Sequence, residues 1–177
     1  GLMVPDTSRF AIGPTSAALL TAADHRMHEG LYAAWASRGS DLPLANPYES
    51  LILASIVEKE TGRAAYRPLV AAVFINRLKL GMRLQTDPAV IYGIGERFDG
   101  NLKKSDLERD HAFNTYLRSG LPPTPIALPG QASLDAVLHP AAVPYLYFVA
   151  RGDGSSEFPS NIADHNRAVA KYQRGGR

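Results

Sequence analysis

The residues best suited to do chemistry are two glutamates at the end of an apolar segment, Glu58 and Glu60 in Leu51–Thr61. At about 100° per residue of a helix, Glu60 projects on the side of Leu53 and Ile56, whereas Glu58 points the opposite way. Burial disfavours a charged carboxylate, so an acid on an apolar stripe keeps its proton to higher pH. Such a carboxyl suits general acid catalysis at neutral pH. The simpler interpretation, which the pattern alone favours, is a helix-end glutamate that reaches into solvent.

A second polar group stands where a loop leads into a short predicted helix. It consists of Gln85, Thr86 and Asp87, directly before Pro88. An aspartate before a proline is typical of a helix N-cap, which alone would account for Asp87. Asp87 is also the one acid placed to act as a second carboxylate beside Glu60.

The loop-rich stretch from residue 82 to 130 contains Asn114 and Tyr116, followed by the proline-rich segment 120–126. A loop region of this length inside a compact domain is usually functional. An amide and a phenol beside rigid backbone suit a groove for a polymer rich in hydroxyl and amide groups. Turn formation would explain Asn114 as well, and core packing with a satisfied hydroxyl would explain Tyr116.

Composition narrows the class of protein. The 177 residues, 45% hydrophobic and 20% charged, fit one globular domain with a sizeable core. The net charge of +2 comes without a dense Lys/Arg stripe, so no nucleic-acid partner is expected. The absence of cysteine excludes disulfides and thiol catalysis. The pair His25 and His28, with Glu29 beside it, has helical spacing that suits a metal. Two ligands on an exposed helix are weak evidence, and we expect neither a metal nor a cofactor.

The hydrophobic pattern predicts the elements that position these residues. Helices are expected over 15–38, 46–61, 66–80, 88–92, 131–138 and 162–173. Asn46, Pro47 and Glu49 form a strong helix start signal. Segment 145–150 is the best strand, and 156–158 is expected to pair back on it. The predicted fold class is therefore α+β, helix-dominated, with a small antiparallel sheet toward the C-terminus.

A series of ordered strings gives a further signal over residues 46–173. They are ASIVEKET (54–61), VFINRL (73–78), GMRLQTDP (81–88), IYG (91–93), NTY (114–116), GLPP (120–123), YLYFVA (145–150) and HN (165–166). Together they resemble the YceG-like family, the endolytic murein transglycosylases. A wider similarity to lysozyme-like transglycosylases aligns their Glu-Ser pair with Glu60–Thr61, which implies a lysozyme-like catalytic domain with Glu60 as the catalytic acid. The candidate substrate-binding or supporting residues are then Gln85, Thr86, Asp87, Tyr92, Asn114 and Tyr116.

The resemblance implies an activity. It is cleavage of the β-1,4 bond between N-acetylmuramic acid and N-acetylglucosamine within peptidoglycan strands, which leaves 1,6-anhydro ends without consuming water. One acid suffices, because the C6 hydroxyl of the same sugar is the nucleophile. Two alternatives stay open: a lysozyme-type muramidase that uses Asp87 as second carboxylate, and a glycan-binding or scaffolding module without turnover.

The resemblance also implies a location and an organisation. The expected place is the extracytoplasmic face of the bacterial cytoplasmic membrane, with cell-wall synthases as candidate partners. No signal peptide or membrane span is visible in the sequence, so the family's membrane anchor is expected outside this chain. Residues 1–45 are expected to be a leading helical segment and 46–177 the YceG-like lytic transglycosylase region, both within one compact domain.

Overall fold

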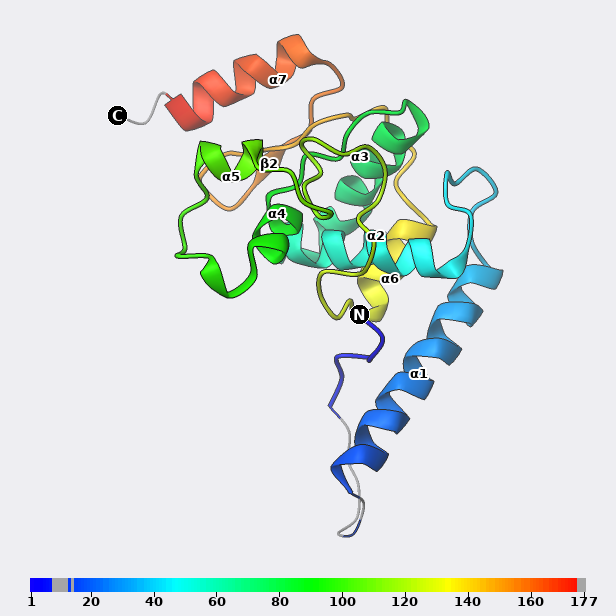
Figure 1. Cartoon of the computed structure of the whole chain (residues 1–177). Helices are drawn as coiled ribbons and strands as arrows, with labels where there is room; N and C mark the ends of the chain where they lie inside the picture. The colour runs from blue at the N-terminus through cyan, green and yellow to red at the C-terminus, as the bar shows by residue number, and fades with distance from the viewer. Residues whose placement is uncertain (8–12, 14, 175–177) are drawn as a thin grey trace.

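The computed structural model describes residues 1–7, 13 and 15–174, and most of its elements are helical (Figure 1). The α-helices are α1 (Ser16–Ala36), α2 (Pro47–Glu60), α3 (Arg67–Lys79), α4 (Asp87–Ile94), α5 (Lys104–Glu108), α6 (Gln131–Leu138) and α7 (Ile162–Val169). Two short 3₁₀ turns, η1 (Ala64–Tyr66) and η2 (Gly95–Arg97), and a π-helical end, η3 (Ala170–Arg174), complete the helical set. Strands β1 (Val149–Ala150) and β2 (Ser156–Glu157) pair antiparallel. The predicted α+β class, helix-dominated with a small sheet toward the C-terminus, is confirmed.

Helix α2 is the central element, because its middle two turns are buried on all sides. Every residue over 50–57 is buried, and α1, α3 and α6 pack around it (Figure 1). Its start follows the predicted capping pattern. Asn46 Oδ1 accepts a hydrogen bond from the Glu49 N–H at 3.0 Å, and the Glu49 carboxylate accepts one from the Ala45 N–H at 2.7 Å. A helix fixed at its start and along its length delivers its C-terminal glutamates to a defined place.

One hydrophobic core joins helices α1, α2, α3 and α6. Phe74 of α3 and Leu53 of α2 are among its largest fully buried side chains. Helix α1 joins the same core through Met27, Leu31 and Ala34, which lie in its second half. The first half of α1 extends away from the body of the molecule (Figure 1).

The strand prediction over 145–150 is wrong for residues 145–148, since only β1 pairs with another strand. Side chains of α3 instead donate hydrogen bonds to backbone carbonyls just before β1. Arg77 Nε donates to the Leu146 carbonyl at 2.8 Å, and Asn76 Nδ2 donates to the Tyr145 carbonyl at 3.0 Å. Because these carbonyls already have partners, this segment needs no second strand. It therefore runs along α3.

The loop-rich stretch contains one helix that was not predicted, α5. Its start is marked by the Lys103 N–H, which donates to Asp106 Oδ2 at 2.9 Å. An acid at the third helical position is the local signal that could have found it. The helix predicted over 88–92 corresponds to α4, which is longer than expected. The predicted closing helix is α7, which continues into the π-helical end η3.

Candidate active site

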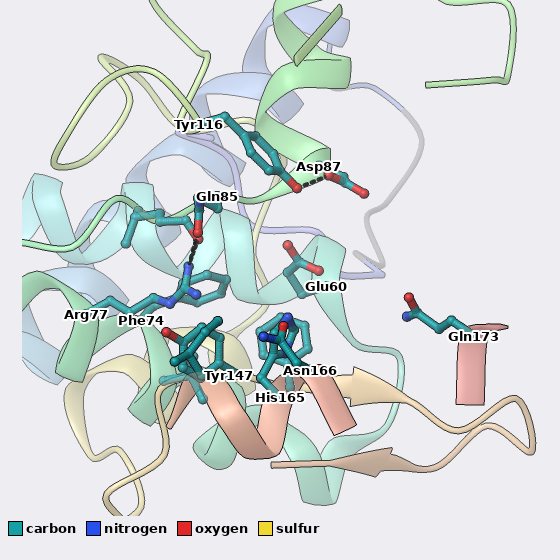
Figure 2. A pocket seen from close by; sticks show the side chains of 14 residues that line it. Glu60, Phe74, Arg77, Gln85, Asp87, Tyr116, Tyr147, His165, Asn166 and Gln173 are labelled. Carbon is teal, nitrogen blue, oxygen red and sulfur yellow. Dashed lines mark hydrogen bonds between the residues drawn. The ribbon is translucent and has the colours of Figure 1, made fainter. Parts of the chain in front are cut away.

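A cleft of about 510 Å³ lies at the C-terminal end of α2 (Figure 2). Its walls come from α2, α3, the start of α4, the segment before β1, and α7. Four of the residues singled out from the sequence line it: Glu60, Gln85, Asp87 and Tyr116. Elements far apart in the chain therefore bring the predicted acid and three of its predicted companions to one place.

Glu60 is largely buried and points into the cleft from the last residue of α2. Its Oε1 accepts a hydrogen bond from the Thr86 hydroxyl at 2.6 Å. Burial raises the pKa of Glu60 to about 7. The Thr86 hydrogen bond opposes this rise, and the nearby Asp87 carboxylate adds to it. In a large fraction of the molecules Glu60 therefore keeps its proton at neutral pH, as a general acid must.

Glu58 lies on the opposite side of α2, as the helical spacing predicts, and it ties α2 to α6. Its Oε2 accepts hydrogen bonds from the Gly130 N–H at 3.0 Å and from the Ser133 hydroxyl at 2.6 Å. The Arg67 guanidinium lies 3.9 Å from its Oε1. Burial alone would raise the pKa of Glu58, but these two hydrogen bonds and the Arg67 charge outweigh it and hold the pKa below its ordinary value. Glu58 is thus a charged residue with a structural role.

The loop before α4 places Gln85 and Thr86 by contacts with Thr115. The Thr86 N–H donates to Thr115 Oγ1 at 3.0 Å, and the Gln85 N–H donates to the Thr115 carbonyl at 3.1 Å. Gln85 has a φ of 52°, a region that residues other than glycine rarely occupy. Its Oε1 accepts a hydrogen bond from Arg77 Nη1 at 3.4 Å. Because arginine only donates, the amide NH₂ of Gln85 is the end left to bind a ligand.

Asp87 is the first residue of α4, and Thr86 is the N-cap residue, so capping does not explain Asp87. The Tyr116 hydroxyl donates to Asp87 Oδ1 at 2.5 Å (Figure 2). Burial raises the pKa of the Tyr116 phenol, and the hydrogen bond and charge of Asp87 raise it further. Tyr116 therefore stays a neutral donor that holds the Asp87 carboxylate in place.

The remaining three candidates, Thr86, Asn114 and Tyr92, do not line the cleft, although Thr86 reaches Glu60 through its hydroxyl. Asn114 is fully buried, and its Nδ2 donates to the Arg109 carbonyl at 2.7 Å and the Leu107 carbonyl at 3.0 Å. Its Oδ1 accepts a hydrogen bond from the Tyr116 N–H at 3.0 Å, so it supports the loop that carries Tyr116. Tyr92 is 47% exposed. Asn114 is therefore a structural residue and does not contact the substrate directly.

Among the cleft residues that were not predicted from the sequence are Arg77, Tyr147, His165 and Asn166. The Arg77 guanidinium lies 4.9 Å from the centre of the Tyr147 ring, and the His165 ring stacks on Tyr147 at 4.7 Å. Arg77 is the one that a local signal could have found. It is a charged residue inside an apolar helical run, as Glu60 is.

Within residues 1–7, 13 and 15–174, no group of three or more His, Cys, Asp or Glu side chains could hold a metal ion. His25 lies 3.5 Å from Glu29, and His28 lies 3.5 Å from Asp24, as two separate pairs on α1. None of the helices in this described part of the chain is long and apolar enough to cross a membrane.

The sequence model of the YceG-like family matches residues 1–171. The chain belongs to the YceG-like family. A relative from Bacillus subtilis (strain 168), named endolytic murein transglycosylase, is 46% identical over 125 residues. A relative of the same name from Streptococcus pneumoniae serotype 2 (strain D39) is 34% identical over 130 residues. Family membership, predicted from the ordered strings, is confirmed.

The same fold is found in the 2.6 Å crystal structure of a putative YceG-like protein from Listeria monocytogenes. The two share 33% sequence identity with a TM-score of 0.76, over 94% of this chain and 53% of that one. The matches to the Bacillus and Streptococcus relatives cover 71% and 70% of this chain, but only 34% and 23% of the relatives. This YceG-like chain therefore corresponds to one part of longer proteins.

Proposed function

We propose that this chain is the catalytic region of an endolytic peptidoglycan lytic transglycosylase, centred on residues 46–177. One observation carries the proposal: Glu60 lies in the cleft, and burial raises the pKa of its carboxyl to about 7. The shared family and the name of the relatives support the substrate class. The reaction is cleavage of the β-1,4 bond between N-acetylmuramic acid and N-acetylglucosamine inside glycan strands.

In the first step Glu60 acts as general acid. Because Thr86 holds Oε1 at 2.6 Å, Oε2 is the oxygen that presents the proton to the glycosidic oxygen. The bond from that oxygen to C1 of the muramic residue breaks, and an oxocarbenium-like centre develops at C1. The carboxylate that remains keeps the Thr86 hydrogen bond, which stabilises its charge.

In the second step the same carboxylate acts as base. It takes the proton of the C6 hydroxyl as that oxygen attacks C1 of the same sugar. The product is a 1,6-anhydro-muramic end, Glu60 regains its proton, and no water is consumed. An intramolecular nucleophile lowers the entropic part of the barrier, which is why one acid is enough.

Asp87 assists this chemistry through its charge. A muramidase would need it as nucleophile or base, but its Oδ1 is already engaged by the Tyr116 hydroxyl at 2.5 Å. Its charge raises the pKa of Glu60 and so keeps the acid protonated. Gln85 is left to hold a carbonyl or hydroxyl oxygen of the sugar through its amide NH₂. This division of roles favours the lytic reaction over hydrolysis.

The place of action follows from the substrate. Peptidoglycan lies outside the cytoplasm, so the protein acts there. Attachment to the outer face of the cytoplasmic membrane and contact with cell-wall synthases belong to the same proposal and rest on the family resemblance. We further propose that residues 1–45 belong to the catalytic region as its leading segment.

Digestion of purified sacculi tests the proposal. Wild type is compared with Glu60→Gln and with Glu58→Gln, a matched control on the other side of the same helix. We expect anhydro-muropeptides from wild type and from Glu58→Gln, and none from Glu60→Gln. Equal release from Glu60→Gln would refute the role of Glu60. Saturable glycan binding by wild type with no new chain ends would show a binding module instead.

A further inference from the structure

Helix α7 forms the wall of the cleft that lies across from Glu60 (Figure 2). Two of its polar side chains, His165 and Asn166, line the cleft but have no part in the proposed proton transfers. We propose that they form a glycan-binding subsite, in which His165 donates a hydrogen bond from Nε2 to a saccharide oxygen and Asn166 pairs with a neighbouring sugar group. This inference deepens the proposed function and rests on it.

The first support is that the His165 ring is held in one orientation. It stacks on Tyr147 with the ring centres 4.7 Å apart and an angle of 26° between the planes. Tyr147 is itself fixed, because its N–H donates to the Pro159 carbonyl at 3.0 Å and the Arg77 guanidinium lies 4.9 Å from its ring centre. A side chain with few rotamers loses little entropy when it binds a ligand.

The second support is the proton on His165. Its Nδ1 is buried and has no hydrogen-bond partner among the described residues. A buried N–H without a partner is rarer than a buried lone pair without one, so the proton of the neutral ring belongs on Nε2. Burial lowers the pKa of His165, and the charge of Arg77 lowers it further, so the ring is neutral at pH 7. His165 therefore offers one donor, at Nε2, to the cleft.

The third support is that the polar groups of both side chains, His165 Nε2 and the Asn166 side-chain amide, are not used in hydrogen bonds of the fold among the described residues. Asn166 is exposed, and its amide makes no hydrogen bond with the part of the chain that the structure describes. Helix α7 is held in other ways: Ala168 is its buried residue, and Asn161 Oδ1 caps it by accepting from the Asp164 N–H at 2.9 Å. His139 shows the contrast, because its Nε2 lies 2.7 Å from the Ser37 carbonyl.

A saccharide matches these groups. Each sugar unit of the glycan offers hydroxyl oxygens and an acetamido group, which can accept from an imidazole N–H and pair with an amide. With Gln85 on the other side of Glu60 in the cleft, the subsite would hold the strand from two walls. Such positioning places the bond to be cut beside the acid.

Calorimetric binding tests the subsite without any turnover. The ligand is a soluble oligosaccharide of alternating N-acetylglucosamine and N-acetylmuramic acid, and the protein is the Glu60→Gln variant. Adding His165→Phe, which keeps an aromatic ring against Tyr147 but removes the donor, should weaken binding about tenfold. Adding His165→Gln, which returns an N–H near the Nε2 position, should restore most of that affinity. His25→Phe, on the exposed face of α1, should leave binding unchanged.

Kinetics on the otherwise wild-type chain give the second readout. His165→Phe should raise KM for glycan strands about tenfold with a smaller change in kcat. Unchanged affinity and unchanged KM in His165→Phe would overturn the subsite. If His165→Phe fails to show a cooperative thermal transition, Asn166→Ala at its exposed position decides. Weaker binding then supports the subsite and unchanged binding overturns it.

These outcomes separate the subsite from the proposed function. A chain that binds the oligosaccharide through His165 but makes no new ends would refute the lytic activity alone. A chain that makes anhydro ends while His165→Phe binds normally would refute the subsite alone.

Discussion

Replacement of Glu60 by glutamine is expected to stabilise the protein at alkaline pH while it removes the activity. Burial raises the pKa of this carboxyl from an ordinary value of 4.5 to about 7. As pH rises, the unfolded chain therefore loses this proton first, and the folded chain keeps it until about pH 7. The folded state binds more protons in this window, so its stability falls as pH rises from 4.5 to about 7 and then levels off.

The size of the effect follows from the two pKa values. A rise from 4.5 to about 7 corresponds to about 3 kcal/mol of folding free energy. Glutamine carries no charge, and its Oε1 can still accept the hydrogen bond from Thr86. Glu60→Gln should therefore be about 3 kcal/mol more stable than wild type near pH 8 and about equal near pH 4. In a domain of this size the difference near pH 8 is roughly 6–12 °C in Tm.

Urea denaturation at about pH 4, 6 and 8 measures this directly, with equal m values as the sign that both proteins unfold alike. The difference in unfolding free energy between the two proteins should grow with pH and then level off. A difference that does not change with pH, or a wild type that is the more stable protein near pH 8, would refute the burial of Glu60 as an uncharged acid.

Three further substitutions probe the surroundings. Glu58→Gln should keep glycan cleavage but lose about 1 kcal/mol in urea denaturation at neutral pH. Because the pKa of Glu58 is lowered in the folded state, that loss should shrink as pH falls through this pKa, and a loss that grows in acid would contradict this. Thr86→Val removes the donor to Glu60, so kcat should fall about tenfold. The Thr86 hydrogen bond lowers the pKa of Glu60, so its removal should move the alkaline fall of kcat/KM, expected near pH 7 in wild type, to higher pH. An unchanged pH profile would contradict the hydrogen bond between Thr86 and Glu60. Gly93→Ala would put a Cβ 2.2 Å from His111 Cε1, which should cost about 1–3 kcal/mol in thermal unfolding; an unchanged Tm would contradict that packing.

The parts of the fold that sequence reasoning predicted are those set by local residues. The start of α2 depends on Asn46 and Glu49, which lie within one turn of each other. The strand over 145–150 could not be judged in the same way, because its backbone partners are side chains of α3. Its aromatic and β-branched composition suits any half-buried extended segment, paired or not.

The same division holds at the cleft. The opposite directions of Glu58 and Glu60 follow from helical spacing alone, and the structure has them so. Whether Glu60 is buried depends on α4 and the segment before β1, which local pattern does not place. His165 belongs to one of the ordered strings, HN (165–166), but a histidine on a polar helix gives no local sign of a binding role. Its stacking on Tyr147 and its unpartnered Nδ1 mark it in the structure.

In the proposed reaction Glu60 is the one group that transfers protons, and the cleavage consumes no water. The most direct test is mass spectrometry of the products from defined glycan strands, digested in water labelled with heavy oxygen. The new muramic ends should be lighter by one water than hydrolysed ends and should carry no heavy oxygen, and Glu60→Gln should produce none of them. New ends that contain heavy oxygen would show hydrolysis and contradict the one-acid mechanism.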